Sequence, residues 1–540
     1  MKKTTLMLAA ALSFSAATFA QTPAQTPTQQ KTTLKLAKVA APAKMAKVIE
    51  NVPEMITKQP AGKLYKDMYG YAKGFISMWG MIYEDKMDGR ARDFVVGDDG
   101  CYYMSSPITF QYTDSWIKGE KGEGDTIVFK LPQQIMVHEV GDDQTVNYYA
   151  ARLKFQKVNG ENQYVYDESS QDMKFVWRND SLIKADTNAL LGMVSEKGDW
   201  NGLGDLISET APNPFVNDGP ADPSKAEKFI FTFHPSERTT TQRISKVVIE
   251  GNDFYANNID PQVPEAWIHG VIDGNKLSFT GAQYMGLDKN KHQYRFNIPF
   301  NVYYDESTYE TVYQQLKKVT FKYDAKTKKV NKCPYGFLSN YGYRNIAMEM
   351  QVVMQPEFEA WNGVIAAPQN PTILQYQEAS SGEGCIIFDL PRNNVKNSFM
   401  DQSYVYFNLF FDDELVTFYP DQYTGISEEM TDVPVDFADA NYAFQTHGSQ
   451  HRVAIYDSGF ERVGVMGVYQ DGDVRLCSDI VWSDGSVTSD IRNAHVSGEV
   501  QAPTYYDLSG RAVAAPAHGV FIKKSVGSDG TVRTSKVVVK

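Results

Sequence analysis

The sequence predicts an all-β protein with two related antiparallel β-meander modules, each closed as a barrel or stacked as a sandwich, then a third β-domain and a small C-terminal β-unit. The composition, with 32 Tyr and 29 Phe, favours pleated, half-buried strands. Short segments such as DTIVFKL and DMKFVW alternate in part between apolar and polar residues, and turn residues separate them. Helical periodicity is rare and holds best over the short stretch 309–318.

The first twenty residues predict an export signal. Lys2 and Lys3 precede an apolar run over residues 6–19, and Ala20 closes it in an A-x-A-like pattern. We expect cleavage between Ala20 and Gln21. A membrane anchor is the alternative, but the run is shorter than the roughly 20 residues that a spanning helix needs, and polar sequence follows it. No later stretch is continuously apolar enough to form a transmembrane segment.

Residues 21–62 are rich in Gln, Thr, Pro, Ala and Lys without a sustained pattern, and we expect a flexible linker. Its lysines could instead form a basic arm for an anionic surface; they are Lys31, Lys35, Lys38, Lys44, Lys47, Lys58 and Lys63, the last just beyond the linker. Without Lys2 and Lys3, 51 basic and 66 acidic residues leave a net charge of −15. This balance argues against a nucleic-acid partner, which needs a concentrated basic face.

Two long segments, 63–215 and 225–362, repeat one series of motifs in the same order. Trp-Ile-Lys-Gly at Trp116 corresponds to Trp-Ile-His-Gly at Trp267, and Gln133 corresponds to Gln283. The separations are 151 and 150 residues. Each copy is large enough to bury its own core, so the sequence predicts tandem duplication of a β-module. Meanders of this kind close into barrels or stack as sandwiches because exposed sheet edges are a liability.

Residues 366–484 contain seven strand candidates, and the last ends in Trp482. This segment resembles a fibronectin type III or immunoglobulin-like sandwich. Cys385 and Cys477 fall within it and could pair in an oxidising compartment, whereas the remaining two cysteines fall in different predicted domains. The chain has no CxxC motif and no Cys/His cluster, so we expect no structural zinc site.

Residues 500–540 form a compact series of strand motifs broken by a Ser-Gly turn. The series resembles the C-terminal sorting domain that the type IX secretion system reads, and the matching residues are Asp507, Gly510, Arg511, Gly519, Lys536 and Lys540. The resemblance implies passage across the outer membrane with the type IX machinery as partner, and then release or surface attachment. An insertion at 525–534 departs from the common form, and an ordinary terminal hairpin is the alternative. The polar segment 491–503 is expected to be a linker.

No enzymatic motif is recognisable. The sequence lacks HExxH, GxSxG and P-loop signatures, and we predict no catalytic, cofactor-binding or metal-binding residue. His447 and His451 flank what is expected to be a loop. The acidic run at 412–414 is expected to be a polar turn, and Asp471 and Asp473 lack the further ligands that a calcium loop needs.

Trp116 and Trp267 are the candidate ligand platform, because both modules place a tryptophan at the same point. Core packing is the competing interpretation. We expect a non-catalytic extracellular or cell-surface protein that binds a host, glycan or protein ligand. A secreted hydrolase acting on polysaccharide or peptide and a lipocalin-like carrier of a small apolar ligand are the alternatives.

Overall fold

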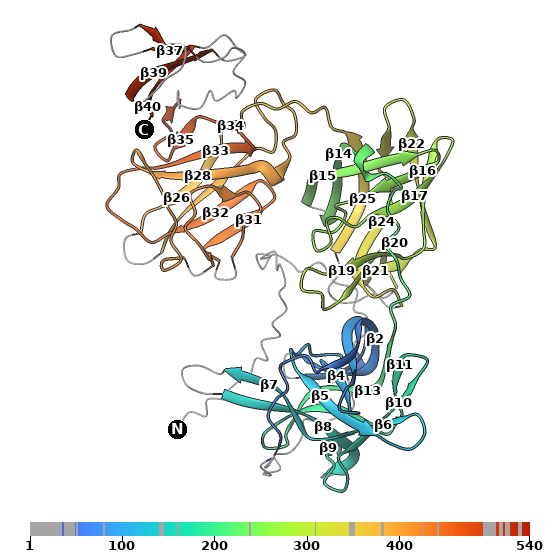
Figure 1. The fold of residues 1–540 in the computed structure, drawn as a ribbon. Coiled ribbons are helices and arrows are strands. Elements are labelled where there is room, and N and C mark those ends of the chain that lie inside the picture. Colours follow the sequence, from blue (N-terminus) through green and yellow to red (C-terminus); the bar gives the residue numbers. More distant parts are fainter. Residues whose placement is uncertain are drawn as a thin grey trace. The chain divides into compact units, whose positions relative to one another are not determined.

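The structure, a computed structural model, consists almost entirely of β-strands (Figure 1). It describes residues 35–36, 49, 52–78, 81–139, 145–158, 161–236, 239–307, 309–344, 351–379, 383–423, 425–439, 442–489, 504–506, 511–513, 519–526 and 532–539. In these residues the only helical segments are the 3₁₀ turns Pro223–Lys225 and Gln402–Tyr404, and no helix is long and apolar enough to cross a membrane. The predicted all-β class is confirmed. The chain divides into two compact units, with the division near residue 360.

Module 1 is one antiparallel sheet that closes on itself, because β2 pairs with β3 along one edge and with β13 along the other. The ring runs β2-β3-β4-β5-β6-β10-β11-β13, and a branch continues from β13 through β12 and β8 to β7, with β9 beside β8. The short strand β1 (Lys35–Leu36) pairs with β3. The other strands are β2 (Gly62–Met78), β3 (Met81–Gly97), β4 (Tyr102–Ser105), β5 (Trp116–Lys121), β6 (Thr126–Lys130), β7 (Gln133–Glu139), β8 (Thr145–Val158), β9 (Glu161–Tyr166), β10 (Asp172–Arg178), β11 (Ser181–Lys184), β12 (Ala189–Ser195) and β13 (Trp200–Ala211).

Module 2 repeats this topology strand for strand. Its ring runs β14-β15-β16-β17-β18-β22-β23-β25, a β14–β25 pairing closes it, and the branch passes through β24 and β20 to β19, with β21 beside β20. The fold therefore contains the repeated modules that the sequence predicts. The strands are β14 (Glu227–Ser236), β15 (Thr239–Glu250), β16 (Asp253–Ala256), β17 (Ile268–Asp273), β18 (Lys276–Thr280), β19 (Gln283–Leu287), β20 (Tyr294–Asp305), β21 (Glu310–Gln315), β22 (Lys318–Asp324), β23 (Lys329–Asn331), β24 (Gly336–Tyr341) and β25 (Gln351–Ala360).

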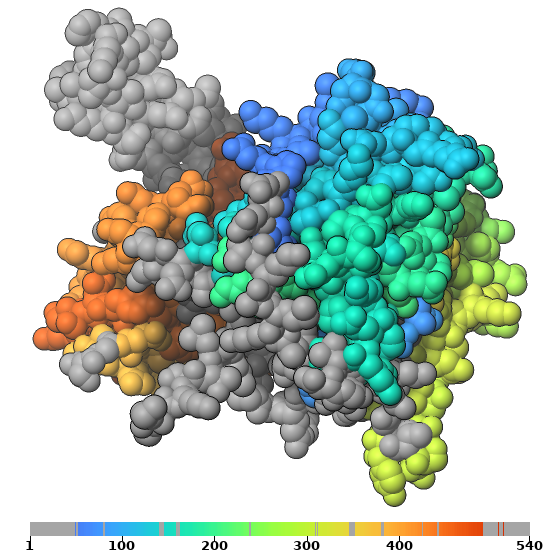
Figure 2. Space-filling view, turned by 90° about the horizontal axis from the view of Figure 1, so that it is seen from below, coloured from blue at the N-terminus to red at the C-terminus, as the bar shows by residue number. Residues whose placement is uncertain are grey.

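Alternation along the strands determines which side chains enter each interior. In β22 every second residue is buried, beginning with Val319, and the residues between them are exposed. Module 2 collects aromatic rings in this way, and the ring centroids of Phe279 and Phe337 are 5.0 Å apart. The interior of module 2 is therefore a packed core, which includes Phe229, Phe231, Phe233, Phe254, Phe279, Phe321, Phe337 and Phe358. Figure 2 shows part of the outer surface of module 1, coloured blue to green.

Two segments differ from what their sequence suggests. The stretch 309–318, the best candidate for helical periodicity, forms β21 and the start of β22; pairing with β20 and the β-branched residues Thr311 and Val312 favour the strand. Within the expected linker 21–62, Ile56 forms a β-bridge with Trp116, and the Trp116 amide donates to the Ile56 carbonyl at 2.9 Å. The end of that segment therefore packs on module 1.

Modules 1 and 2 are joined by direct main-chain contacts within the first unit. The Ala91 amide of β3 donates to the His292 carbonyl at 2.8 Å, and Arg90 forms a β-bridge with Gln293. The Tyr294 hydroxyl donates to the Asp67 carbonyl, and the Tyr69 and Tyr294 rings lie 4.9 Å apart. Main-chain pairing of this kind fixes the relative orientation of the two contacting edges more firmly than side-chain contact alone.

Asp88 is the centre of this junction. Its carboxylate is buried and accepts hydrogen bonds from the Tyr69 hydroxyl at 2.7 Å and from the amides of Tyr343 and Arg344 at 2.9 and 2.7 Å. Gly342, with φ +69°, approaches so closely that a Cβ there would lie 2.5 Å from the Asp88 carboxylate. A buried carboxylate with three donors stabilises the contact only while all three remain in place.

The second unit contains two sheets that enclose one core. The order is β26-β27-β32-β31 in one sheet and β29-β28-β33-β35-β36 in the other, with β30 beside β28 and β34 beside β33. Ile386 and Val453 from the first sheet pack with Phe407 and Val465 from the second. The strands are β26 (Thr372–Gln377), β27 (Gly384–Asp389), β28 (Val405–Phe411), β29 (Glu414–Leu415), β30 (Val433–Pro434), β31 (Phe444–His447), β32 (Gln450–Ile455), β33 (Val463–Asp471), β34 (Val474–Cys477), β35 (Ile480–Trp482) and β36 (Val487–Thr488).

The chain ends in a four-stranded antiparallel sheet of order β38-β37-β39-β40. Its strands are β37 (Thr504–Tyr506), β38 (Ala512–Val513), β39 (Gly519–Val526) and β40 (Val532–Val539). Of the predicted sorting residues, Arg511 directly precedes β38, Gly519 begins β39 and Lys536 pairs with Ile522 in β40. Asp507, Gly510, Lys540, the linker 491–503 and the cleavage residues Ala20 and Gln21 lie outside the described residues.

Replacement of Asp88 by Ala should loosen the junction, because two main-chain amides and a buried hydroxyl lose their acceptor. We expect a loss of about 3 kcal/mol in local stability. Hydrogen exchange of the Ala91 amide measures this, with Asp98→Ala, a change in an exposed turn, as the control. Unchanged protection of Ala91 in Asp88→Ala would contradict the role of Asp88.

Candidate functional site

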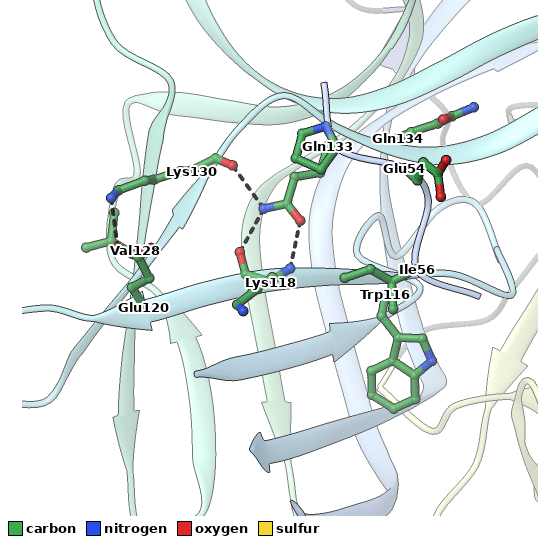
Figure 3. Close-up of a pocket in the computed structure, with 10 residues that line it drawn as sticks. Glu54, Ile56, Trp116, Lys118, Glu120, Val128, Lys130, Gln133 and Gln134 are labelled. Carbon is green, nitrogen blue, oxygen red and sulfur yellow. Dashed lines mark hydrogen bonds and ion pairs between the residues drawn. The ribbon is translucent and has the colours of Figure 1, made fainter. Parts of the chain in front are cut away.

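A cavity of about 210 Å³ lies on the outer side of module 1 (Figure 3). Residues 53–56 border it on one side, and strands β5, β6 and β7 supply the remaining walls. Pro53, Ile56 and Val128 contribute apolar atoms to the lining. The polar residues that line the cavity are Glu54, Lys118, Glu120, Lys130, Gln133 and Gln134.

The alternation of two neighbouring strands explains why charged side chains gather here. In β5 the side chains of Lys118 and Glu120 point outward, whereas Ile117 and Gly119 are buried. Glu120 lies opposite Val128 of β6, which places Lys130 on the same outer face. The Lys130 ammonium forms an ion pair with Glu120 at 2.7 Å. The hydrogen bond from Lys130 lowers the pKa of Glu120, so this carboxylate is ionised at neutral pH.

Gln133 links two strand edges through its side chain. Its Oε1 accepts from the Lys118 amide at 2.7 Å, and its Nε2 donates to the carbonyls of Lys118 and Lys130 at 2.7 and 2.9 Å (Figure 3). The carboxamide therefore substitutes for a peptide group between β5 and the start of β7. Gln283 does the same in module 2, where both of its bonds to the main chain of His269 measure 2.7 Å.

Lys118 belongs to a group of polar contacts beside the cavity. Its ammonium lies 3.0 Å from Asp99, which also accepts from the Tyr103 hydroxyl at 2.7 Å. These hydrogen bonds, with that of Tyr103 the largest contribution, hold the pKa of Asp99 well below its usual range. The hydrogen bond to Asp99 raises the pKa of Lys118.

Module 2 has a related group at the equivalent position. His269 Nε2 lies 2.7 Å from Asp253, and the imidazole stacks on the Tyr255 ring at 4.8 Å. Tyr255 faces His269 across the strands as Tyr103 faces Lys118. An acid, a tyrosine and a basic side chain thus accompany β5, which begins at Trp116, and β17, which begins directly after Trp267.

The two predicted platform tryptophans differ in their surroundings. The Trp116 side chain packs with Val95 and Tyr103 in a hydrophobic cluster, and only 7% of the residue is exposed. Figure 3 shows its indole directed away from Gln133 and Gln134. The Trp116 ring therefore belongs mainly to the core of module 1.

Trp267 is half-buried and is held from the segment before β14. The Asn217 carboxamide binds both the amide and the carbonyl of Trp267, at 3.1 and 2.8 Å. Gly219 lies against the indole, since a Cβ there would be 2.9 Å from Cδ1. The Asn217 side chain thus binds the main chain of Trp267, as the main chain of Ile56 binds that of Trp116 in module 1.

The remaining candidates from the sequence lie apart from the cavity residues. His447 and His451 belong to β31 and β32, the two strands of a hairpin; His451 is buried against Phe388, and burial lowers its pKa to about 4. Of the acidic residues 412–414, the first two form the turn between β28 and β29, and Glu414 begins β29. Residues 471–473 lead from β33 to β34. Cys385 and Cys477 are not joined by a disulfide and lie in different sheets. Among the described residues no group of three or more His, Cys, Asp or Glu side chains could hold a metal ion.

Sequence reasoning missed the cavity and most of its polar residues. Gln133 and Gln283 were recognisable as repeated residues, but their spacing gives no sign of a bond to a neighbouring strand. Glu54 and Ile56 lie in the segment expected to be a linker. Lys130 and Glu120 come together only because β5 and β6 pair. No protein-family model matches the chain, and no curated protein matches it.

Replacement of Gln133 by Ala, or of Gln283 by Ala in module 2, should remove the contact between the β5 or β17 edge and the next strand. We expect a loss of about 1 to 2 kcal/mol in the free energy of unfolding. Amide exchange should quicken at Lys118 and His269 respectively, since each amide loses its acceptor. Gln134→Ala is the control, because Gln134 bonds to the Asn147 side chain and to no strand edge in the described contacts. Equal exchange at Lys118 in Gln133→Ala and wild type would contradict the assignment.

Proposed function

We propose that the protein is a non-catalytic, exported binding protein that takes one unit of a polar glycan in the cavity of module 1. The observation that carries the proposal is the cavity wall, where the Lys130–Glu120 ion pair stands beside alkyl surface from Ile56 and Val128. A volume of about 210 Å³ lies below the roughly 300 to 1,000 Å³ of sites for drug-sized ligands. One sugar ring at the end of a longer chain suits this volume, and sugars combine hydroxyl groups with apolar ring faces.

Comparison of the modules supports assigning the specificity to these charges. Gln133 recurs as Gln283, and a tryptophan stands before both, so these residues belong to the common scaffold. Where module 1 has Glu120 and Lys130, module 2 has Val271 and Thr280. The fold therefore does not require the ion pair at this position, and a binding role accounts for it.

The electrostatics favour binding over hydrolysis. A glycosidase needs one carboxyl group with a raised pKa to act as general acid. The pKa of Glu120 is lowered by Lys130, and that of Asp99 is lowered by Tyr103, Cys101 and Lys118. Both carboxyl groups are therefore ionised at neutral pH and hold no proton to donate as a general acid. The packed aromatic interior of module 2 likewise disfavours a lipocalin-like carrier.

We also propose that the protein acts outside the cytoplasm and that the secretion machinery recognises its C-terminal domain as the signal for export. Support comes from the signal-like N-terminus and from the tail, whose described part pairs β37 to β40 as a separate sheet. In the second unit, the division into β26-β27-β32-β31 and β29-β28-β33-β35 supports the resemblance to an immunoglobulin-like or fibronectin type III sandwich. Such a domain would serve as a spacer or as a further binding surface.

A glycan array probed with the mature chain, residues 21–540, tests the binding proposal. We expect retention of a defined set of polar glycans. Lys130→Ala should weaken binding of the best one by at least about tenfold, equivalent to about 1.4 kcal/mol, because the cavity loses a cation. Thr280→Ala, the equivalent change in module 2, is the control. Equal binding by Lys130→Ala, or release of new reducing ends from the glycan, would contradict the proposal.

Deletion of residues 500–540 tests the export proposal in the native host. The upstream domains should still fold, because the tail sheet pairs only within itself in the described residues. The truncated protein should then accumulate in the periplasm. Fractionation of cells and medium measures this, and equal export of the truncated and full-length chains would show that the tail is an ordinary terminal hairpin.

A further inference from the structure

The β20–β21 hairpin of module 2 exposes three tyrosines. Tyr303, Tyr304 and Tyr309 are 44%, 58% and 78% exposed, although tyrosines elsewhere in the described chain are mostly buried or half-buried. Tyr303 and Tyr304 are successive residues of a strand and therefore point to opposite faces of the hairpin. Tyr309 stands at the turn, with φ +56°. The tip thus presents aromatic rings in several directions, away from any core.

Module 1 shows that the fold does not require these tyrosines. Its equivalent hairpin joins β8 to β9, and the final strand pairs, Val158 with Glu161 and Asp305 with Glu310, align the two. In this alignment Gln156 and Lys157 occupy the places of Tyr303 and Tyr304. One scaffold therefore carries a polar, basic pair in module 1 and an aromatic pair in module 2. A difference of this kind at an exposed tip points to recognition.

The tip of the tyrosine hairpin is also acidic. Asp305 and Glu306 follow Tyr304 directly. The Ser307 amide and hydroxyl donate to Asp305 at 2.9 and 2.6 Å, which orders the turn around this carboxylate. Aromatic faces and carboxylates together suit ammonium and guanidinium groups, which are attracted both by ring quadrupoles and by negative charge.

The hairpin lies far along β20 from the junction with module 1. Tyr294 makes the junction contact, and Tyr304 follows ten residues later, roughly 33 Å along an extended strand. In the described sheet, β21 pairs with β20 alone. An edge strand of this kind can accept the main chain of an extended peptide, which then places alternate side chains against neighbouring pockets.

We propose that the tyrosine hairpin, residues 301–307 and 309–314, docks a basic, extended polypeptide segment of another protein. The segment adds to the edge of β21 through its main chain, while its Lys or Arg side chains lie against the tyrosine rings and the Asp305 and Glu306 carboxylates. This surface is separate from the cavity of module 1 and does not depend on a glycan being bound there.

The test uses the mature chain and a fluorescent oligolysine peptide, with oligoglutamate of equal length as the negative probe. Fluorescence anisotropy should show that Tyr303→Ser, Tyr304→Ser and Tyr309→Ser combined weaken oligolysine binding at least tenfold. The corresponding triple Phe variant should retain it, because Phe keeps the ring face. Phe155→Ser, on the equivalent hairpin of module 1, is the matched control and should bind as wild type.

Three outcomes would overturn the proposal. The triple Ser variant could bind oligolysine as tightly as wild type, which would assign the binding to general negative charge. The triple Phe variant could lose binding as completely as the Ser variant, which would show that the rings do not act through their faces. Sedimentation could show that wild type self-associates and that the Ser variant does not, which would make a second copy of the chain the occupant. Amide exchange of β20 verifies that each variant is folded.

Discussion

The requirement that sheet edges find partners governs both modules. A meander of short strands has two open edges, and exposed edges invite aggregation. In module 1 the long strand β2 meets β3 on one side and β13 on the other, and β14 does the same with β15 and β25 in module 2. Closure of the ring does not include the branch of strands that ends at β7 in module 1 and at β19 in module 2. The carboxamides of Gln133 and Gln283 connect that branch to the ring, and the cavity of module 1 forms beside this connection.

The architecture was predictable from the sequence because its evidence is local and repeated. Alternation of apolar and polar residues indicates strands such as β22. The nearly equal separations of Trp116 from Trp267 and of Gln133 from Gln283 indicate the duplication. The ring closure and the Asp88 junction depend on residues far apart in the chain, which no single-sequence pattern reports. The Gln133 contact spans only 15 residues, but it depends on how β5 and β7 are placed in the sheet. In the stretch 309–318 a local pattern was misleading. Its weak helical periodicity does not produce a helix, because residues 310–315 pair with β20 as a strand. The cavity was unpredictable for a similar reason, because Glu54 reaches it from a segment without pattern.

The two copies keep a buried polar tether but build it from different residues. In module 1 the loop between β4 and β5 is held by Thr109, whose amide and hydroxyl donate to the buried Asp205, itself beside Arg92. In module 2 the residue 151 positions later is Asp260, which accepts from Arg295 at 2.7 Å. In both modules a buried charge on or against this loop fixes the approach to the strand that carries the repeated motif. Loss of one partner from such a pair would leave an uncompensated buried charge, so both partners are needed in each copy.

The features that the two modules share, and those in which they differ, explain how a duplicated frame can serve two kinds of recognition. The closing strands, the glutamine contacts and the loop tethers recur in both modules, and they hold the frame. The outer faces diverge: Lys130 and Glu120 line a cavity in module 1, whereas Tyr303 and Tyr304 stand on a projecting hairpin in module 2. Because the Ala91–His292 main-chain bond and the hydrogen bonds to the Asp88 carboxylate join the two frames, a ligand on one module and a partner on the other would be held at a defined separation. Two weak contacts held in this way reinforce one another only if both targets lie on the same surface, since the effective concentration of the second contact depends on that fixed span.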